Sequence, residues 1–182
     1  MLEAMLVRKW APTLARIKCA NLMTAHFKDC VAFAREVSAL RLRMKGYGVT
    51  LTILRMDEGS AQLYLYRPAM LRKVLSDQAV REFLSMEGYS AFGVGEALNR
   101  LRQRLREGSF PHEIGLFLGY PLSDVQAFIR HRGRGCALCG IWKAYDHVED
   151  AQAYCECCRQ CSIRAMNCFQ AGQSLEDLIV AG

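Results

Sequence analysis

The sequence predicts an α+β fold that is mainly helical, with one antiparallel β-hairpin (49–67) and a third strand (137–145) packed against helices. Three observations lead to this prediction. Apolar residues recur at helical spacing through most of the chain, and the spacing changes to alternation at 49–67. No apolar run reaches the roughly 18–20 residues of a membrane span. Because an isolated hairpin is marginally stable, we expect a three-stranded antiparallel sheet with helices on one face.

The N-terminal third of the chain is predicted to be helical. A short helix over 2–10 should stop before Pro12, and a second short helix is expected over 12–23. From Phe27 to Met44 the apolar residues follow the i, i+3, i+4, i+7 pattern of an amphipathic helix, which Gly46 should end.

The hairpin prediction is based on two alternating segments, VTLTIL (49–54) and AQLYLYR (61–67). Both are rich in β-branched or aromatic residues, as strands are. Asp57 and Gly59 supply turn residues between them, and Pro68 closes the second strand.

Helices are expected again after residue 69. Helical periodicity covers 69–75, 79–86 and 94–108, and a pair of short helices is expected around the GYP at 119–121. A long helix is predicted over 146–172, where Asp146 and Glu149 have the spacing of a capping box.

Length and composition indicate one domain over 1–182. The chain has 182 residues, 52% hydrophobic residues and a net charge of +6. The N-terminal apolar stretch is too short for a signal-peptide core, so we expect a cytoplasmic protein with no membrane partner. Nine cysteines cannot all pair within one chain, and cytosolic thiols are kept reduced, so disulfides are not expected.

Charge is unevenly distributed along the chain. Residues 100–135 contain seven arginines and three acids, whereas residues 146–177 contain six acids and two arginines. This pattern fits either an anionic partner or two solvated surfaces of opposite sign, and we favour the second interpretation.

The cysteines allow two interpretations. Cys136-x2-Cys139 and Cys158-x2-Cys161 have the spacing of a four-cysteine zinc site, and an iron–sulfur cluster uses similar ligands. Placed on the predicted long helix, however, Cys158 and Cys161 fall on a stripe with Tyr154, Ala165 and Cys168, which favours cysteine as a small buried hydrophobe.

The segment HEIGLFLGYPLSDVQAFIRHRG resembles a helix-turn-helix, with Gly115 at the helix crossing and Gly119 at the turn. A nucleic-acid-binding protein is therefore an alternative over 112–131. An αα-hairpin inside a larger domain obeys the same steric rules and remains open. The residues that would contact nucleic acid are Ser123, Gln126, Arg130, Arg132 and Arg134.

Several motifs together resemble a family of uncharacterised, clostridial-type proteins known only as a domain of unknown function: PHEIGLFLGYP, CGIWKAY, LYLYRP, APTL and CFQAGQSLEDLIVA. The resemblance implies one domain from about residue 8 to 181 and no known activity. It also implies that Cys139 and Cys161 match cysteines common in the family, whereas Cys136 and Cys158 do not, which weakens the four-cysteine site.

The polar residues inside these motifs are the candidate ligand-binding residues, and basic members among them suit an anionic ligand. They are Thr13, Arg67, His112, Glu113, Lys143 and Tyr145. Structural ion pairs and caps are an equally weighted alternative. We therefore expect a protein that binds a small anionic ligand or cofactor in redox or metal metabolism, without an assigned reaction. A nucleic-acid binder and a partner-binding accessory protein are the alternatives.

Overall fold

The structure, a computed structural model, describes residues 2–180. Its centre is a three-stranded antiparallel sheet of β1 (Ala20–His26), β2 (Thr50–Asp57) and β3 (Ser60–Tyr66), in the order β1-β3-β2. The α+β class and the hairpin of 49–67 are confirmed. The hairpin turns at Gly59, whose φ of +73° suits a residue without a side chain.

Strand β3 explains why the sheet has two covered faces. Its residues Leu63, Tyr64 and Leu65 are all fully buried. Leu63 and Leu65 belong to a core shared with α1 (Leu2–Leu14) and α2 (Cys30–Arg43), whereas Tyr64 belongs to the opposite core. The expectation of helices on one face only is therefore wrong, because a strand apolar on both sides needs cover on both sides.

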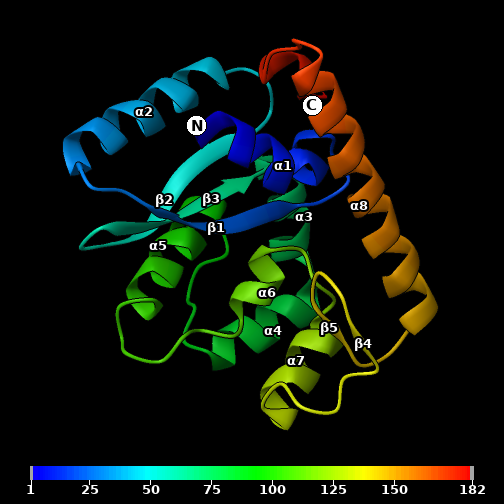
Figure 1. Cartoon of the computed structure of the whole chain (residues 1–182). Coiled ribbons are helices and arrows are strands. Elements are labelled where there is room, and N and C mark those ends of the chain that lie inside the picture. The colour runs from blue at the N-terminus through cyan, green and yellow to red at the C-terminus, as the bar shows by residue number, and fades with distance from the viewer. Residues whose placement is uncertain (1, 181–182) are drawn as a thin grey trace.

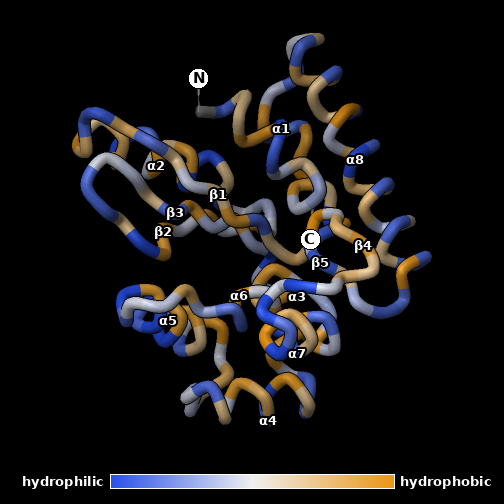
Figure 2. The backbone as a smooth tube through the Cα atoms, turned by 60° about the horizontal axis from the view of Figure 1, so that its bottom comes forward, coloured by the Kyte–Doolittle hydropathy of each residue, from blue (hydrophilic) through white to orange (hydrophobic). Residues whose placement is uncertain are grey.

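The opposite face is covered by five helices that follow β3 in the chain, and Figure 1 shows α4, α5, α6 and α7 below the sheet with α1 and α2 above it. They are α3 (Pro68–Ser76), α4 (Gln78–Met86), α5 (Val94–Arg104), α6 (Ile114–Phe117) and α7 (Leu122–His131). Figure 2 shows hydrophobic and hydrophilic residues alternating along the helices, as amphipathic helices with one buried face require.

The last part of the chain joins the two layers from the side. A separate two-stranded hairpin of β4 (Leu138–Cys139) and β5 (Lys143–Ala144) lies between α7 and α8 (Val148–Gln170). Helix α8 runs along the side of the molecule and packs on α1 (Figure 1), and a 3-10 turn (Glu176–Leu178) follows it.

The N-terminal prediction is wrong in two respects. Helix α1 continues through Pro12 to Leu14, and the segment expected to be a second helix contains strand β1. Leu6, Trp10 and Leu14 are all at most 1% exposed, so burial of this face outweighs the hydrogen bond that proline removes. β1 is also the third strand of the sheet, in place of 137–145, which pairs only with itself.

Two helix ends also differ from expectation. Helix α2 begins at Cys30 because Asp29 caps it by accepting from the amides of Val31 and Ala32. The expected capping box of α8 does not form, since the helix begins after His147, which has a φ of +47° and no side-chain capping bond.

Candidate ligand-binding site

A cavity of about 370 Å³ lies between α6, α7 and the β4–β5 hairpin. Its walls are mostly apolar and aromatic, with few polar groups, as small-molecule sites are. The lining residues with aromatic, basic or thiol side chains that matter for binding are Tyr120, Phe128, Trp142, His112, Lys143 and Cys139.

Gly115 lets α6 and α7 meet closely at this cavity, and Gly119 lets the turn between the two helices lie against Cys19. A β-carbon on Gly115 would lie 2.7 Å from Val125 Cγ2, and one on Gly119 would lie 2.7 Å from Cys19 Cβ. Gly119 also has a φ of +80°. Gly115 at the helix crossing and Gly119 in the turn therefore have the steric roles that the sequence predicted.

The hairpin is attached to α7 through the buried carboxylate of Asp124. Asp124 Oδ2 accepts from Trp142 Nε1 at 2.7 Å, and its Oδ1 accepts from the Tyr145 amide at 2.8 Å. The Trp142 indole then stacks on Tyr120, with ring centroids 5.3 Å apart. This arrangement holds the aromatic wall of the cavity in place.

Lys143 places a positive charge in the cavity wall. Its Nζ donates to the Gly133 carbonyl at 2.6 Å and lies 5.9 Å from the Phe128 ring centroid. Within residues 2–180, no carboxylate forms an ion pair with this ammonium. A positive charge without an acid at ion-pair distance favours an anionic ligand.

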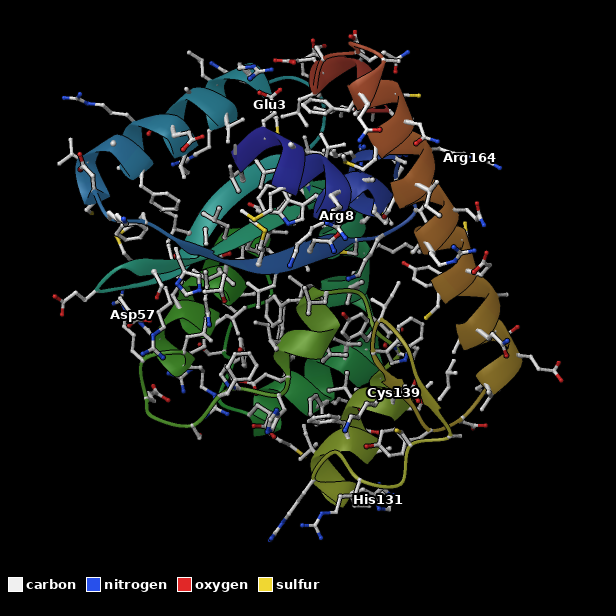
Figure 3. All side chains as sticks on the ribbon, viewed as in Figure 1. Glu3, Arg8, Asp57, His131, Cys139 and Arg164 are labelled. Carbon is white, nitrogen blue, oxygen red and sulfur yellow. The ribbon has the colours of Figure 1, made fainter. Side chains whose placement is uncertain are left out.

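His112 and Cys139 are the other polar side chains of this wall. The His112 ring packs edge-on against Phe128 at 5.0 Å and is exposed. Cys139 is also exposed and lies directly opposite Lys143 in the hairpin register. Figure 3 shows Cys139 on this hairpin, with His131 at the far end of α7. The structure thus brings together the predicted residues His112, Lys143 and Cys139.

Glu113, predicted beside His112, faces the core instead. It is 1% exposed and accepts from Arg104 Nε at 2.9 Å and from the Tyr89 hydroxyl at 3.2 Å. These contacts join α5 to α6, so Glu113 has a structural role. Tyr145 stacks on His131 at 5.7 Å, outside the cavity wall, and its buried hydroxyl has no hydrogen-bond partner among residues 2–180.

Arg67 and Thr13 lie together, but not in this cavity wall. The Arg67 guanidinium is buried and donates to the carbonyls of Thr13, at 2.7 Å, and of Leu14 and Val180. The Thr13 hydroxyl donates to Asn21 Oδ1 at 2.6 Å. These bonds tie the end of α1 to β3 and to the C-terminal segment.

Sequence reasoning missed Lys18, a lysine only 3% exposed. Its Nζ donates to the Tyr120 hydroxyl at 3.4 Å and lies 5.0 Å from that ring centroid, behind the cavity wall. Burial lowers the pKa of Lys18 to about 8, an effect that the thiols of Cys158 and Cys19 oppose. The buried position could not be found from the sequence, because Lys18 lies in the segment expected to be an amphipathic helix.

The nine cysteines are all free thiols. Cys158 is buried, and burial raises its pKa to about 11, whereas Cys161 is half-buried and lines a different cavity with Cys157 and Cys168. Cys155 contacts the hairpin, where its Sγ accepts from the Ile141 amide at 3.4 Å. Among the described residues, no group of three or more His, Cys, Asp or Glu side chains is placed to hold a metal ion. A site of Cys136, Cys139, Cys158 and Cys161 stays a prediction from spacing.

The nucleic-acid hypothesis also stays a prediction. Its first helix, α6, has only four residues, and the second, α7, turns Asp124 toward the hairpin. Arg102 and Arg104, which precede this segment in the chain, donate to Thr52 Oγ1 and to Glu87 and Glu113. The side chains that remain exposed or half-exposed are Ser123, Gln126, Arg130, Arg132 and Arg134.

The fold and the cavity define an α+β protein with a small, mainly apolar cavity between a helix pair and a short hairpin. The chain belongs to the family described as protein of unknown function (DUF3793), whose model matches residues 6–179. Neither the comparison with curated proteins nor that with solved structures finds a match. Over residues 2–180, the structure contains no helix with the length and apolarity to cross a membrane.

Proposed function

We propose that this protein binds a small anionic ligand or cofactor with a flat, apolar body in the cavity between α6, α7 and the β4–β5 hairpin. The observation that carries the proposal is the Lys143 ammonium in an aromatic wall without an acidic partner among the described residues. Nine free thiols support a reducing compartment, the cytoplasm, as the place of action.

The size and chemistry of the cavity indicate the kind of ligand. A volume of about 370 Å³ accommodates a fused two-ring compound, and Phe128 and Trp142 offer ring faces for stacking. Lys143 would contact the anionic group, and the exposed His112 ring would lie beside it. Asp124 also lines the cavity, but its oxygens accept from Trp142 and Tyr145.

The test compares 2-naphthoate with 2-naphthamide, which has the same rings but no charge, by isothermal titration calorimetry. We expect 2-naphthoate to bind about tenfold more tightly, because one charge–charge contact contributes about 1.4 kcal/mol in a partly exposed site. Lys143→Gln should abolish this preference, whereas Lys73→Gln, at an exposed residue of α3, should preserve it.

His112→Ala should weaken binding of 2-naphthoate while leaving the melting temperature nearly unchanged, because this side chain is exposed. A large fall in melting temperature would assign His112 a structural role. Equal affinity for the two compounds, or binding of neither, would contradict the proposal.

A further inference from the structure

Cys139 differs from the other cysteines in its surroundings. It is an exposed thiol that lines the same cavity as Lys143 and His112. Reactive cysteines occur in positively charged, partly exposed surroundings, whereas cysteines in apolar cores are inert. Cys158 and Cys19 are of the second kind, since burial raises their pKa to about 11 and about 12.

The hairpin register determines which side chain neighbours Cys139. Cys139 and Lys143 are directly opposite each other across β4 and β5. Side chains of opposite residues project from the same face of a two-stranded sheet, with β-carbons roughly 4.5–5.5 Å apart. The turn between them is attached on its other side to Cys155 of α8 and, through Trp142, to Asp124 of α7. The backbone therefore holds Cys139 and Lys143 on the same face of the hairpin, and both residues line the cavity.

We propose that Cys139 is a nucleophilic thiol that forms a covalent bond with an anionic, electrophilic ligand of the cavity, of the α,β-unsaturated carboxylate class. This inference rests on the proposed function, because Lys143 would bind the carboxylate. The sulfur adds to the β-carbon and the π bond between the α- and β-carbons breaks. The proton lost by the thiol ends on the α-carbon, carried by water, which reaches the exposed Cys139 and His112.

The step needs no oxidant, reductant or further reactant, because it is an addition in which every atom of ligand and thiol is retained. Lys143 contributes through its positive charge, which attracts the carboxylate of the ligand to the cavity wall that contains Cys139. The same charge would repel a cationic ligand and give a neutral ester no advantage.

The test uses monomethyl fumarate, which carries one carboxylate, and dimethyl fumarate, its neutral ester. The full-length protein is treated with each compound at pH 7.5, and adducts are assigned to individual cysteines by peptide mass spectrometry over time. The quantity compared is the ratio of the two rates at one thiol. Cys157 is the internal reference, because it is exposed in the middle of α8.

We expect the ratio of the monomethyl fumarate rate to the dimethyl fumarate rate to be about fivefold higher at Cys139 than at Cys157. The ratio at Cys139 should fall as salt is added. Lys143→Gln should bring the two ratios together, whereas Lys73→Gln should not change them. Equal ratios at Cys139 and Cys157 in the wild-type protein would overturn the proposal, and this comparison needs no variant to fold.

A further variant separates this inference from the proposed function. Cys139→Ser should remove the covalent adduct at this position, while 2-naphthoate binding is measured on the wild-type protein, in which Cys139 is intact. If 2-naphthoate binds with the expected charge preference and Cys139 shows no preference for monomethyl fumarate, the covalent proposal alone fails. If 2-naphthoate does not bind, the proposed function fails, whatever the reactivity of Cys139.

Discussion

The indole nitrogen of Trp142 donates to the Asp124 carboxylate at 2.7 Å, and this bond attaches the β4–β5 hairpin to helix α7. Asp124 is only 4% exposed, and its second oxygen accepts from the Tyr145 amide. One acid thus satisfies two donors of the hairpin and closes one side of the cavity.

Replacing Asp124 should therefore loosen the hairpin. Asp124→Ala leaves two donors without their acceptor, which costs about 2–4 kcal/mol of unfolding free energy in urea denaturation. Trp142 emission should also shift to longer wavelength as water reaches the indole. Asp57→Ala is the matched control, because Asp57 is exposed and pairs only with Arg55, a contact worth less than about 1 kcal/mol. Equal effects of the two variants would contradict the buried role of Asp124.

Lys18 makes stability depend on pH in an unusual direction. Its pKa is lowered from 10.5 to about 8 in the folded protein, so between these values the unfolded chain binds more protons and stability rises with pH. Below pH 8 Lys18 is charged in the folded protein, and the burial of this charge lowers the free energy of unfolding by at most about 3 kcal/mol. Lys18→Met should therefore raise the unfolding free energy at pH 7 by about 1–3 kcal/mol.

The measurement is urea denaturation of both proteins at pH 7 and at pH 9.5. The raised pKa values of Cys158 and Cys19 make both proteins lose stability as pH rises. Because the Lys18 charge lowers these two pKa values, its replacement raises them further, and the variant loses more stability at high pH than the wild type. The difference in unfolding free energy between Lys18→Met and the wild type should be smaller at pH 9.5 than at pH 7. A variant less stable than wild type at pH 7 would show that Lys18 stabilises the fold.

Arg67 should be a structural residue. Its guanidinium satisfies the carbonyls of Thr13, Leu14 and Val180, at a site where it is only 2% exposed. After Arg67→Met the carbonyls of Thr13 and Leu14 keep the amides of Arg16 and Val180 as donors but lose the guanidinium, and we expect a loss of about 3–5 kcal/mol in urea denaturation. Arg72→Met, at an exposed residue of α3, should change stability by less than about 0.5 kcal/mol. A mild effect at Arg67 would leave it available as a binding residue.

Gly119 should tolerate no side chain. Gly119→Ala adds a β-carbon 2.7 Å from Cys19 Cβ at a residue with φ +80°, so contact and backbone strain both act. Gly108→Ala has a similar φ, +98°, but no atom within 4 Å of the added carbon. We expect about 1 kcal/mol of destabilisation at Gly108 and at least about 2 kcal/mol more at Gly119, measured by thermal melting. Similar losses would show that strain alone decides the cost.

The strength of a local pattern decided how well each element was predicted. The hairpin of 49–67 has alternating residues and turn chemistry in one continuous stretch, so its sequence contains its own evidence. Strand β1 has no such evidence: only Met23 and Ala25 alternate as buried residues, and its pairing with β3 connects residues 34 or more positions apart. Pro12 led to the wrong helix end for the same reason. The helix continues through Pro12 because α1 is buried in the assembled core, and this burial is not visible in the local sequence.

The sequence by itself determined the α+β class, the hairpin, the long C-terminal helix and the presence of His112, Lys143 and Cys139 in polar positions of distinctive motifs. The tertiary structure alone decided which of these residues meet. His112 and Lys143 come to the same cavity because Gly115 lets α6 and α7 meet closely and Asp124 anchors the hairpin. Lys18 was hidden because burial depends on packing between distant segments, which local sequence does not encode.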